Sequence, residues 1–161
     1  MDCLQSYNPI MKIHTFTYSC ILNTDRENAF AFHTDARNLP RITPPWIKVD
    51  IISMLLPLKE KSILELAIKR FGITTEWKIE IDSLKFPHTL TDLMVSGPFR
   101  YFKHERHFIS LNNNETLMNE TLSIVLPFGA LGNLFYPWVK KEIDAMFEFR
   151  HIETQRHFLK K

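Results

Sequence analysis

The last thirty or so residues of the chain constrain its fold most strongly. From Gly129 to about Phe158 the only helix-breaking residues are Gly132 and Pro137, so this stretch predicts one long C-terminal helix. Such a helix spans roughly 45 Å, about the width of a small domain. Its apolar side chains cover well over half of its circumference, whereas a surface helix needs an apolar stripe only somewhat wider than about 100°. We therefore expect a curved sheet to grip the helix, or the helix to form one wall of a cavity, with Pro137 marking a kink or a late helix start.

The rest of the chain predicts one strand, two short helices and six further strands, in that order. Thr24 and Glu27 have the spacing of a capping box at the start of a short helix. Residues 35–39 predict a second helical turn, which Pro40 ends. Short turns join consecutive strands, so these strands must be antiparallel. Alternation typical of strands is found at residues 12–21, 47–51, 62–71, 73–81, 89–95, 99–111 and 115–126.

This order of elements is accompanied by a set of short local signals. They are Asn38-Leu39, Ile42-Thr43-Pro44-Pro45, Trp77, Asp92, Gly97-Pro98-Phe99, Phe102-Lys103-His104, Phe108, Pro127-Phe128-Gly129, Met146-Phe147 and Arg150. Together they resemble the helix-grip fold of the START-like (SRPBCC) superfamily, which includes the Bet v 1-like pollen allergens, the polyketide cyclases and the lipid-transfer START domains. The resemblance runs from Ile13 to Arg150 and points to a bacterial cyclase/dehydrase subgroup of ligand-binding proteins.

The resemblance implies an α+β fold in which a seven-stranded, curved antiparallel sheet wraps around the long C-terminal helix, with two short helices after the first strand. Two positions depart from the pattern of the subgroup. Phe102 stands in place of a tryptophan, and Glu120 stands in place of an aspartate. Both changes keep the chemical type of the side chain and can alter the shape of a pocket.

Size and composition bound the possible functions. The length of 161 residues predicts a single domain over 1–161, which the resemblance implies is START-like, with a loose N-terminal lead-in at 1–11. A net charge of +2 gives no pull toward nucleic acid. The apolar region 124–139 is too short and too interrupted for stable membrane insertion. The two cysteines, Cys3 and Cys20, make no disulfide framework and favour a reducing, cytoplasmic setting.

The strand at 99–111 carries the most informative polar residues. Because side chains alternate along a strand, His104 and Arg106 are expected on the face toward the helix. If the turn at 112–114 centres the last hairpin, Arg106 lies opposite Glu120, and we expect these two side chains to pair. A slip of one residue would move both to the outer face.

The preceding hairpin adds an acidic residue to this group. If Gly97 centres it, Asp92 lies opposite Phe102 and diagonal to His104. We therefore predict one inward polar cluster of Asp92, His104, Arg106 and Glu120. Two interpretations stay open: Arg106 clamps a ligand carboxylate or hydroxyl while His104 moves a proton, or the cluster is a structural ion-pair network without a ligand.

Several large side chains are candidates for a pocket or for plain core. Glu142 has apolar helical neighbours, so it either projects into a cavity or lies at its rim. The candidate ligand contacts are Trp77, Asp92, Phe102, His104, Arg106, Phe108, Glu120, Trp138, Glu142 and Met146. The sequence has no convincing metal motif and no glycine-rich phosphate loop, so no metal or cofactor is expected.

Three functions fit these observations. The first is a binding module for a small hydrophobic molecule such as a lipid, polyketide, quinone or isoprenoid. The second is a cyclase, dehydratase or isomerase that uses His104 for proton transfer, with Asp92, Arg106 and Glu120 in support. The third is an interaction protein with a packed, ligand-free interior. The volume of any internal cavity separates the third function from the other two.

Overall fold

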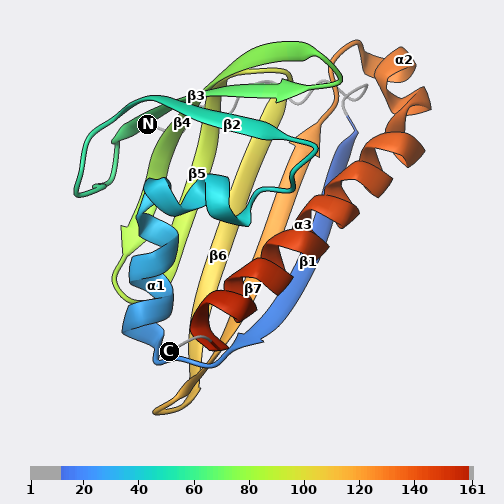
Figure 1. Ribbon diagram of the computed structural model, residues 1–161. Helices are drawn as coiled ribbons and strands as arrows, with labels where there is room; N and C mark the ends of the chain where they lie inside the picture. Colours follow the sequence, from blue (N-terminus) through green and yellow to red (C-terminus); the bar gives the residue numbers. More distant parts are fainter. Residues whose placement is uncertain (1–11, 160–161) are drawn as a thin grey trace, which may run out of the picture.

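The structure, a computed structural model, describes residues 12–159. The lead-in predicted at 1–11 lies outside the described residues. A seven-stranded sheet curves around the long C-terminal helix, and the two short helical segments cover the same face (Figure 1). The strands are β1 (Ile13–Leu22), β2 (Lys48–Met54), β3 (Ile63–Arg70), β4 (Ile73–Lys85), β5 (Thr89–Ser96), β6 (Tyr101–Asn112) and β7 (Glu115–Val125). The helices are α1 (Arg26–Thr34), the 3₁₀ helix η1 (Ala36–Ile42), α2 (Gly129–Leu134) and α3 (Tyr136–Leu159).

The sheet has the strand order β1-β7-β6-β5-β4-β3-β2, and every neighbouring pair is antiparallel. The six later strands follow one another through short turns, whereas β1 crosses to pair with the last strand, β7. The two small helical segments occupy the connection from β1 to β2, which lie at opposite edges of the sheet. The predicted helix-grip architecture is confirmed.

The C-terminal helix is broken, in contrast to the single helix predicted from Gly129 onward. The segment α2 ends at Leu134, and α3 begins at Tyr136. Pro137 explains the break, because a proline ring inside a helix clashes with the carbonyl group four residues earlier. The alternative of a late helix start at Pro137 is therefore the correct one.

Two details of the helical connection also differ from the prediction. The N-cap of α1 is Asp25, whose carboxylate accepts a hydrogen bond from the Asn28 N–H at 2.8 Å, and Thr24 does not cap the helix. Aspartate is the stronger capping residue of the two. The segment η1 also runs through Pro40 instead of ending there. A 3₁₀ segment of this length loses only one backbone donor to a proline.

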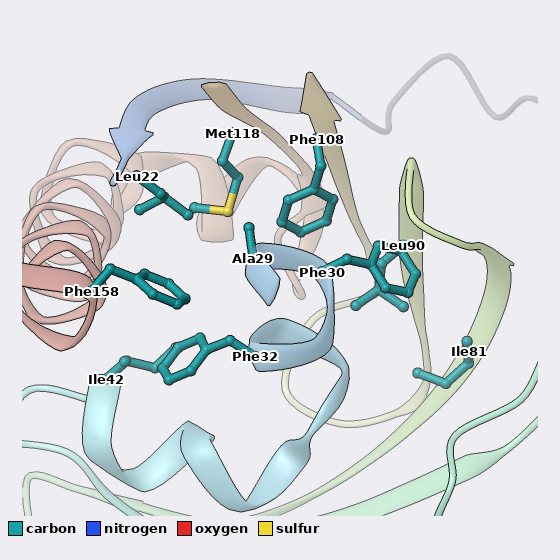
Figure 2. Packing of buried hydrophobic residues seen from close by; sticks show 10 residues of the cluster. All are labelled: Leu22, Ala29, Phe30, Phe32, Ile42, Ile81, Leu90, Phe108, Met118 and Phe158. Atoms are coloured by element: carbon teal, nitrogen blue, oxygen red, sulfur yellow. The ribbon is translucent and has the colours of Figure 1, made fainter. Parts of the chain in front are cut away.

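The helices pack on the sheet most closely at one end of the molecule. Figure 2 shows Phe30 and Phe32 of α1 and Phe158 of α3 converging with Phe108 and Met118 of the sheet. Within α3, the buried residues are Ile143, Phe147, Thr154 and Phe158, so the first two turns carry none. The helix is therefore buried against the sheet mainly over its later turns, whereas its start contacts β1 through the stacked rings of Tyr136 and His14.

Candidate functional site

A cavity of about 490 Å³ lies between the sheet, η1 and α3. Its walls are mostly aliphatic and aromatic side chains, with a small number of polar groups. Most of the predicted ligand-contact residues line it, namely Trp77, Asp92, Phe102, His104, Arg106, Trp138, Glu142 and Met146. Ligand contact by these residues stays a prediction, but the geometry brings them to one space.

Two of the predicted contact residues do not line the cavity. Phe108 is buried beside Phe30, with ring centroids 5.5 Å apart, in the cluster that closes one end of the sheet (Figure 2). Glu120 lies behind His104, and its side chain has no exposed surface. The alternation that placed both residues on the inner face was correct, but inner-face residues near α1 and α3 are covered by those helices.

The opening of the cavity is marked by lining residues that solvent also reaches. Phe71, Ile73 and Trp138 are 66%, 68% and 52% exposed, and the rings of Phe71 and Trp138 lie 5.5 Å apart. Arg70 at the end of β3 forms an ion pair with Glu142 on α3. Glu142 therefore lies at the rim, where its charge bridges the hairpin of β3 and β4 to the helix.

The polar cluster forms on the inner wall as predicted, but its pairing is different. Arg106 lies opposite Glu120 in the register, yet its guanidinium forms an ion pair with Asp92. Glu120 instead accepts hydrogen bonds from His104 Nε2 at 2.6 Å and from His151 Nε2 at 2.7 Å. The predicted Arg106–Glu120 pair is therefore wrong, because a histidine of α3 occupies the space in front of Glu120.

The register of β5 against β6 also differs from the prediction. Asp92 lies opposite His104, not opposite Phe102. The turn is centred on Pro98, one residue later than Gly97. Moving the centre of a hairpin by one residue shifts the partner of each residue by two positions. A shift of two keeps every side chain on its face, so Asp92 still points inward and its Oδ2 lies 3.9 Å from His104 Nδ1.

The Glu120 carboxylate is ionised although it is fully buried. Burial alone would raise its pKa, but the hydrogen bonds from His104 and His151 outweigh burial and hold the pKa well below its ordinary value. Burial, together with the charge of Arg106, lowers the pKa of His104. Neutral His104 thus carries its proton on Nε2, where Glu120 accepts it, and its Nδ1 keeps a free electron pair.

Three polar residues of this region escaped the sequence analysis as site residues: His33, Arg150 and His151. His33 follows Phe32 in α1, and both it and Arg150 line the cavity. The helix pattern held a usable signal, because Arg150 and His151 fill the gap between Phe147 and Thr154 on the buried stripe of α3. His33 gave no such signal in a helix this short.

Other kinds of site find little support in the described chain. Within residues 12–159, no group of three histidine, cysteine or acidic side chains could hold a metal ion. No helix in that range is long and apolar enough to cross a membrane. The chemistry available at the cavity is therefore that of an apolar surface with imidazole, guanidinium and carboxylate groups around His104 and one ion pair, Arg70–Glu142, at the opening.

Comparison with known proteins identifies a matching family and several solved structures with a similar fold. The family described as polyketide cyclase / dehydrase and lipid transport matches residues 22–149. No protein of curated function matches the chain. A START superfamily protein from Mycobacterium smegmatis has a similar structure, with 16% identity, coverage of 91% of this chain and 98% of that chain, and a TM-score of 0.70.

Two enzymes of solved structure share the fold. Norcoclaurine synthase from Thalictrum flavum, in complex with dopamine and hydroxybenzaldehyde, is 12% identical, with coverage of 94% of this chain and 90% of that chain and a TM-score of 0.69. The Zhui aromatase/cyclase from Streptomyces is 14% identical, with coverage of 92% of both chains and a TM-score of 0.66. At these identities the likeness establishes the fold alone.

The buried histidines predict a loss of stability in mild acid. Burial lowers the pKa of His33 from its ordinary 6.5 to about 3. Unfolded His33 binds a proton below pH 6.5 and folded His33 does not, so stability is full above pH 6.5 and falls as the pH drops toward 3. His104 acts in the same direction. Each contributes a slope of up to about 1.4 kcal/mol per pH unit, and His33→Phe should remove one of the two contributions.

Urea unfolding between pH 6.5 and 5 measures this slope before most carboxylates titrate. His107→Gln is the matched control, because His107 is exposed on the outer face of β6. The control should keep the wild-type slope. Equal slopes for wild type and His33→Phe would contradict the assignment of His33 as a buried, neutral residue.

Proposed function

Because the chain belongs to the polyketide cyclase / dehydrase and lipid transport family, we propose that it binds a small hydrophobic molecule in the cavity between the sheet and α3. The observation that carries the proposal is the cavity itself. Its volume of about 490 Å³ falls in the range of roughly 300–1,000 Å³ that is usual for small-molecule sites. A lipid, polyketide, quinone or isoprenoid would match such a space.

The lining supports an apolar ligand with one polar end. Leu64, Leu66 and Ile79 contribute aliphatic surface from β3 and β4, and Trp77 and Phe102 contribute rings 5.7 Å apart. One group of polar side chains lies around His104 and Arg106, and a second charged pair, Arg70 and Glu142, lies at the opening. A cavity of this size also argues against the alternative of a packed, ligand-free interior.

We further propose a reducing, cytoplasmic location for this activity. Support comes from the free thiol of Cys20, which is partly buried in β1 and forms no disulfide. Burial raises the pKa of this thiol to about 12, so it stays protonated and unreactive at neutral pH.

The binding proposal predicts saturable uptake of an uncharged apolar dye. N-phenyl-1-naphthylamine should gain fluorescence on binding and raise the melting temperature by mass action. At a free concentration of 100 times Kd the stabilisation is about 2.7 kcal/mol. Met146→Trp fills part of the cavity and should abolish dye binding.

Ile152→Trp provides the matched control, because Ile152 lies on the same helix, is 40% exposed and does not line the cavity. This variant should bind the dye as the wild type does. Absence of saturable binding by the wild type, or equal binding by Met146→Trp, would count against a ligand in this cavity.

A second candidate function is proton transfer by His104, as in a cyclase, dehydratase or isomerase. The specific observation is the hydrogen bond to Glu120, which fixes the proton on Nε2 and leaves Nδ1 as a base beside the cavity. The arrangement suits removal of a proton from carbon next to a carbonyl group. Arg106, whose Nε has no partner, could stabilise the oxyanion that forms.

Hydrogen–deuterium exchange of 2-tetralone, an apolar ketone with acidic α-hydrogens, tests this second function. Wild type in D₂O should accelerate the exchange, and His104→Gln should lose about 100-fold, in keeping with general-base catalysis. Glutamine keeps a donor for Glu120 but offers no base. His107→Gln on the outer face of the same strand should exchange at the wild-type rate. Exchange no faster than in buffer would leave binding as the function.

A further inference from the structure

The cavity collects buried polar atoms that lack a hydrogen-bond partner. Within residues 12–159 such side-chain atoms are Arg26 Nε, His33 Nε2, Arg106 Nε and Arg150 Nε. All but the first belong to residues that line the cavity. Buried polar groups in proteins are nearly always bonded, so a shortfall gathered in one cavity points to a ligand group that accepts hydrogen bonds.

The ion pairs and hydrogen bonds at this end of the cavity leave the Arg150 guanidinium without a direct ionic partner. Asp92 is paired with Arg106, and both oxygens of Glu120 are occupied by His104 and His151. No carboxylate of the described chain lies within ion-pair distance of the Arg150 guanidinium, which contacts the Phe147 ring at 5.5 Å from its centroid.

An arginine keeps its positive charge in proteins, even though burial lowers the pKa of Arg150 here. His33 is neutral, since burial holds its pKa at about 3. The two arginines and the two carboxylates sum to zero charge, but Asp92 pairs directly with Arg106, and the oxygens of Glu120 accept hydrogen bonds from histidines instead of from Arg150. Arg150, which is only partly exposed, is thus the arginine without a direct ionic partner, and charges removed from water are normally paired.

We propose that His33, Arg106 and Arg150 form a subsite for the carboxylate of an otherwise apolar acid. The proposal rests on the binding function above and specifies its ligand class. A single negative charge would neutralise Arg150, and the planar guanidinium matches the geometry of a carboxylate. An alcohol or ester would give Arg150 no ionic partner.

The position of the subsite also orients the ligand. Trp138 at the opening and Arg150 lie on the same helix, twelve residues apart, which is about 18 Å along the axis. The carboxylate therefore lies deep in the cavity, and the apolar part extends past Trp77 and Phe102 toward the opening at Phe71 and Trp138. An elongated acid, such as a fatty acid, fits this direction.

Calorimetric titration with dodecanoate and with its uncharged methyl ester tests the subsite. Wild type should bind dodecanoate at least about tenfold more tightly than the ester, as expected for charge-assisted hydrogen bonds. Arg150→Met should weaken dodecanoate binding to the level of the ester while ester affinity stays within about twofold. Arg150→Lys keeps the charge without the planar fork and should fall in between.

Arg156→Met is the matched control, because Arg156 lies on the same helix, is exposed and pairs with Glu153. It should keep the wild-type preference for dodecanoate. A melting temperature of ligand-free Arg150→Met at or above that of the wild type would support an unpaired cation at this position and show that the variant is folded.

The outcomes separate this inference from the binding function. If N-phenyl-1-naphthylamine, dodecanoate and methyl dodecanoate all fail to bind the wild type, the binding function itself is wrong. If all three bind, but acid and ester bind equally well and Arg150→Met changes neither, only the carboxylate subsite is wrong.

Discussion

The buried carboxylate of Glu120 joins the parts of the molecule that define the cavity. It stands on β7, accepts one hydrogen bond from His104 on β6 and another from His151 on α3, and so ties the helix to the sheet. Phe147, one turn before His151, stacks on Tyr18 of β1 with ring centroids 4.3 Å apart. The helix is thus fixed in its middle, while its first turns meet the β3–β4 hairpin only at the rim, through the Arg70–Glu142 ion pair and the rings of Phe71 and Trp138. This asymmetry places His104 and Arg106 at the held end of the cavity, and exposed aromatic side chains together with the Arg70–Glu142 ion pair at the open end.

The fold was largely readable from the sequence because its signals are periodic and redundant. Alternation fixed the strands, short turns fixed their antiparallel pairing, and the last hairpin fixed the register of Arg106 opposite Glu120. The error at the start of α1 lies where two capping residues compete. Asp25 and Thr24 both suit an N-cap, and the aspartate prevails. Pro137 was recognised as a kink or a helix start, and the structure shows α3 beginning beside it, at Tyr136.

The location of the candidate site was predictable from the sequence, but the partners in its ion pairs and hydrogen bonds were predictable only in part. Alternation along β6 and β7 placed His104, Arg106 and Glu120 on the inner wall, but it says nothing about which neighbour on a distant helix reaches them. His151 is 31 residues from Glu120, and its position depends on how α3 crosses the sheet. His33 and Arg150 likewise line the cavity because of the way their helices pack on the sheet. Contacts between elements far apart in sequence are set by packing, which no local pattern encodes.

Native mass spectrometry of freshly purified protein tests the central claim, a ligand-holding cavity, most directly. The account predicts a second species, heavier than the bare chain by the mass of a small hydrophobic molecule, which disappears on denaturation and is recovered in an organic extract. The cavity-filled Met146→Trp variant, prepared in parallel, should show the bare chain alone. Bare chain alone from the wild type, or the same adduct on both proteins, would contradict the account.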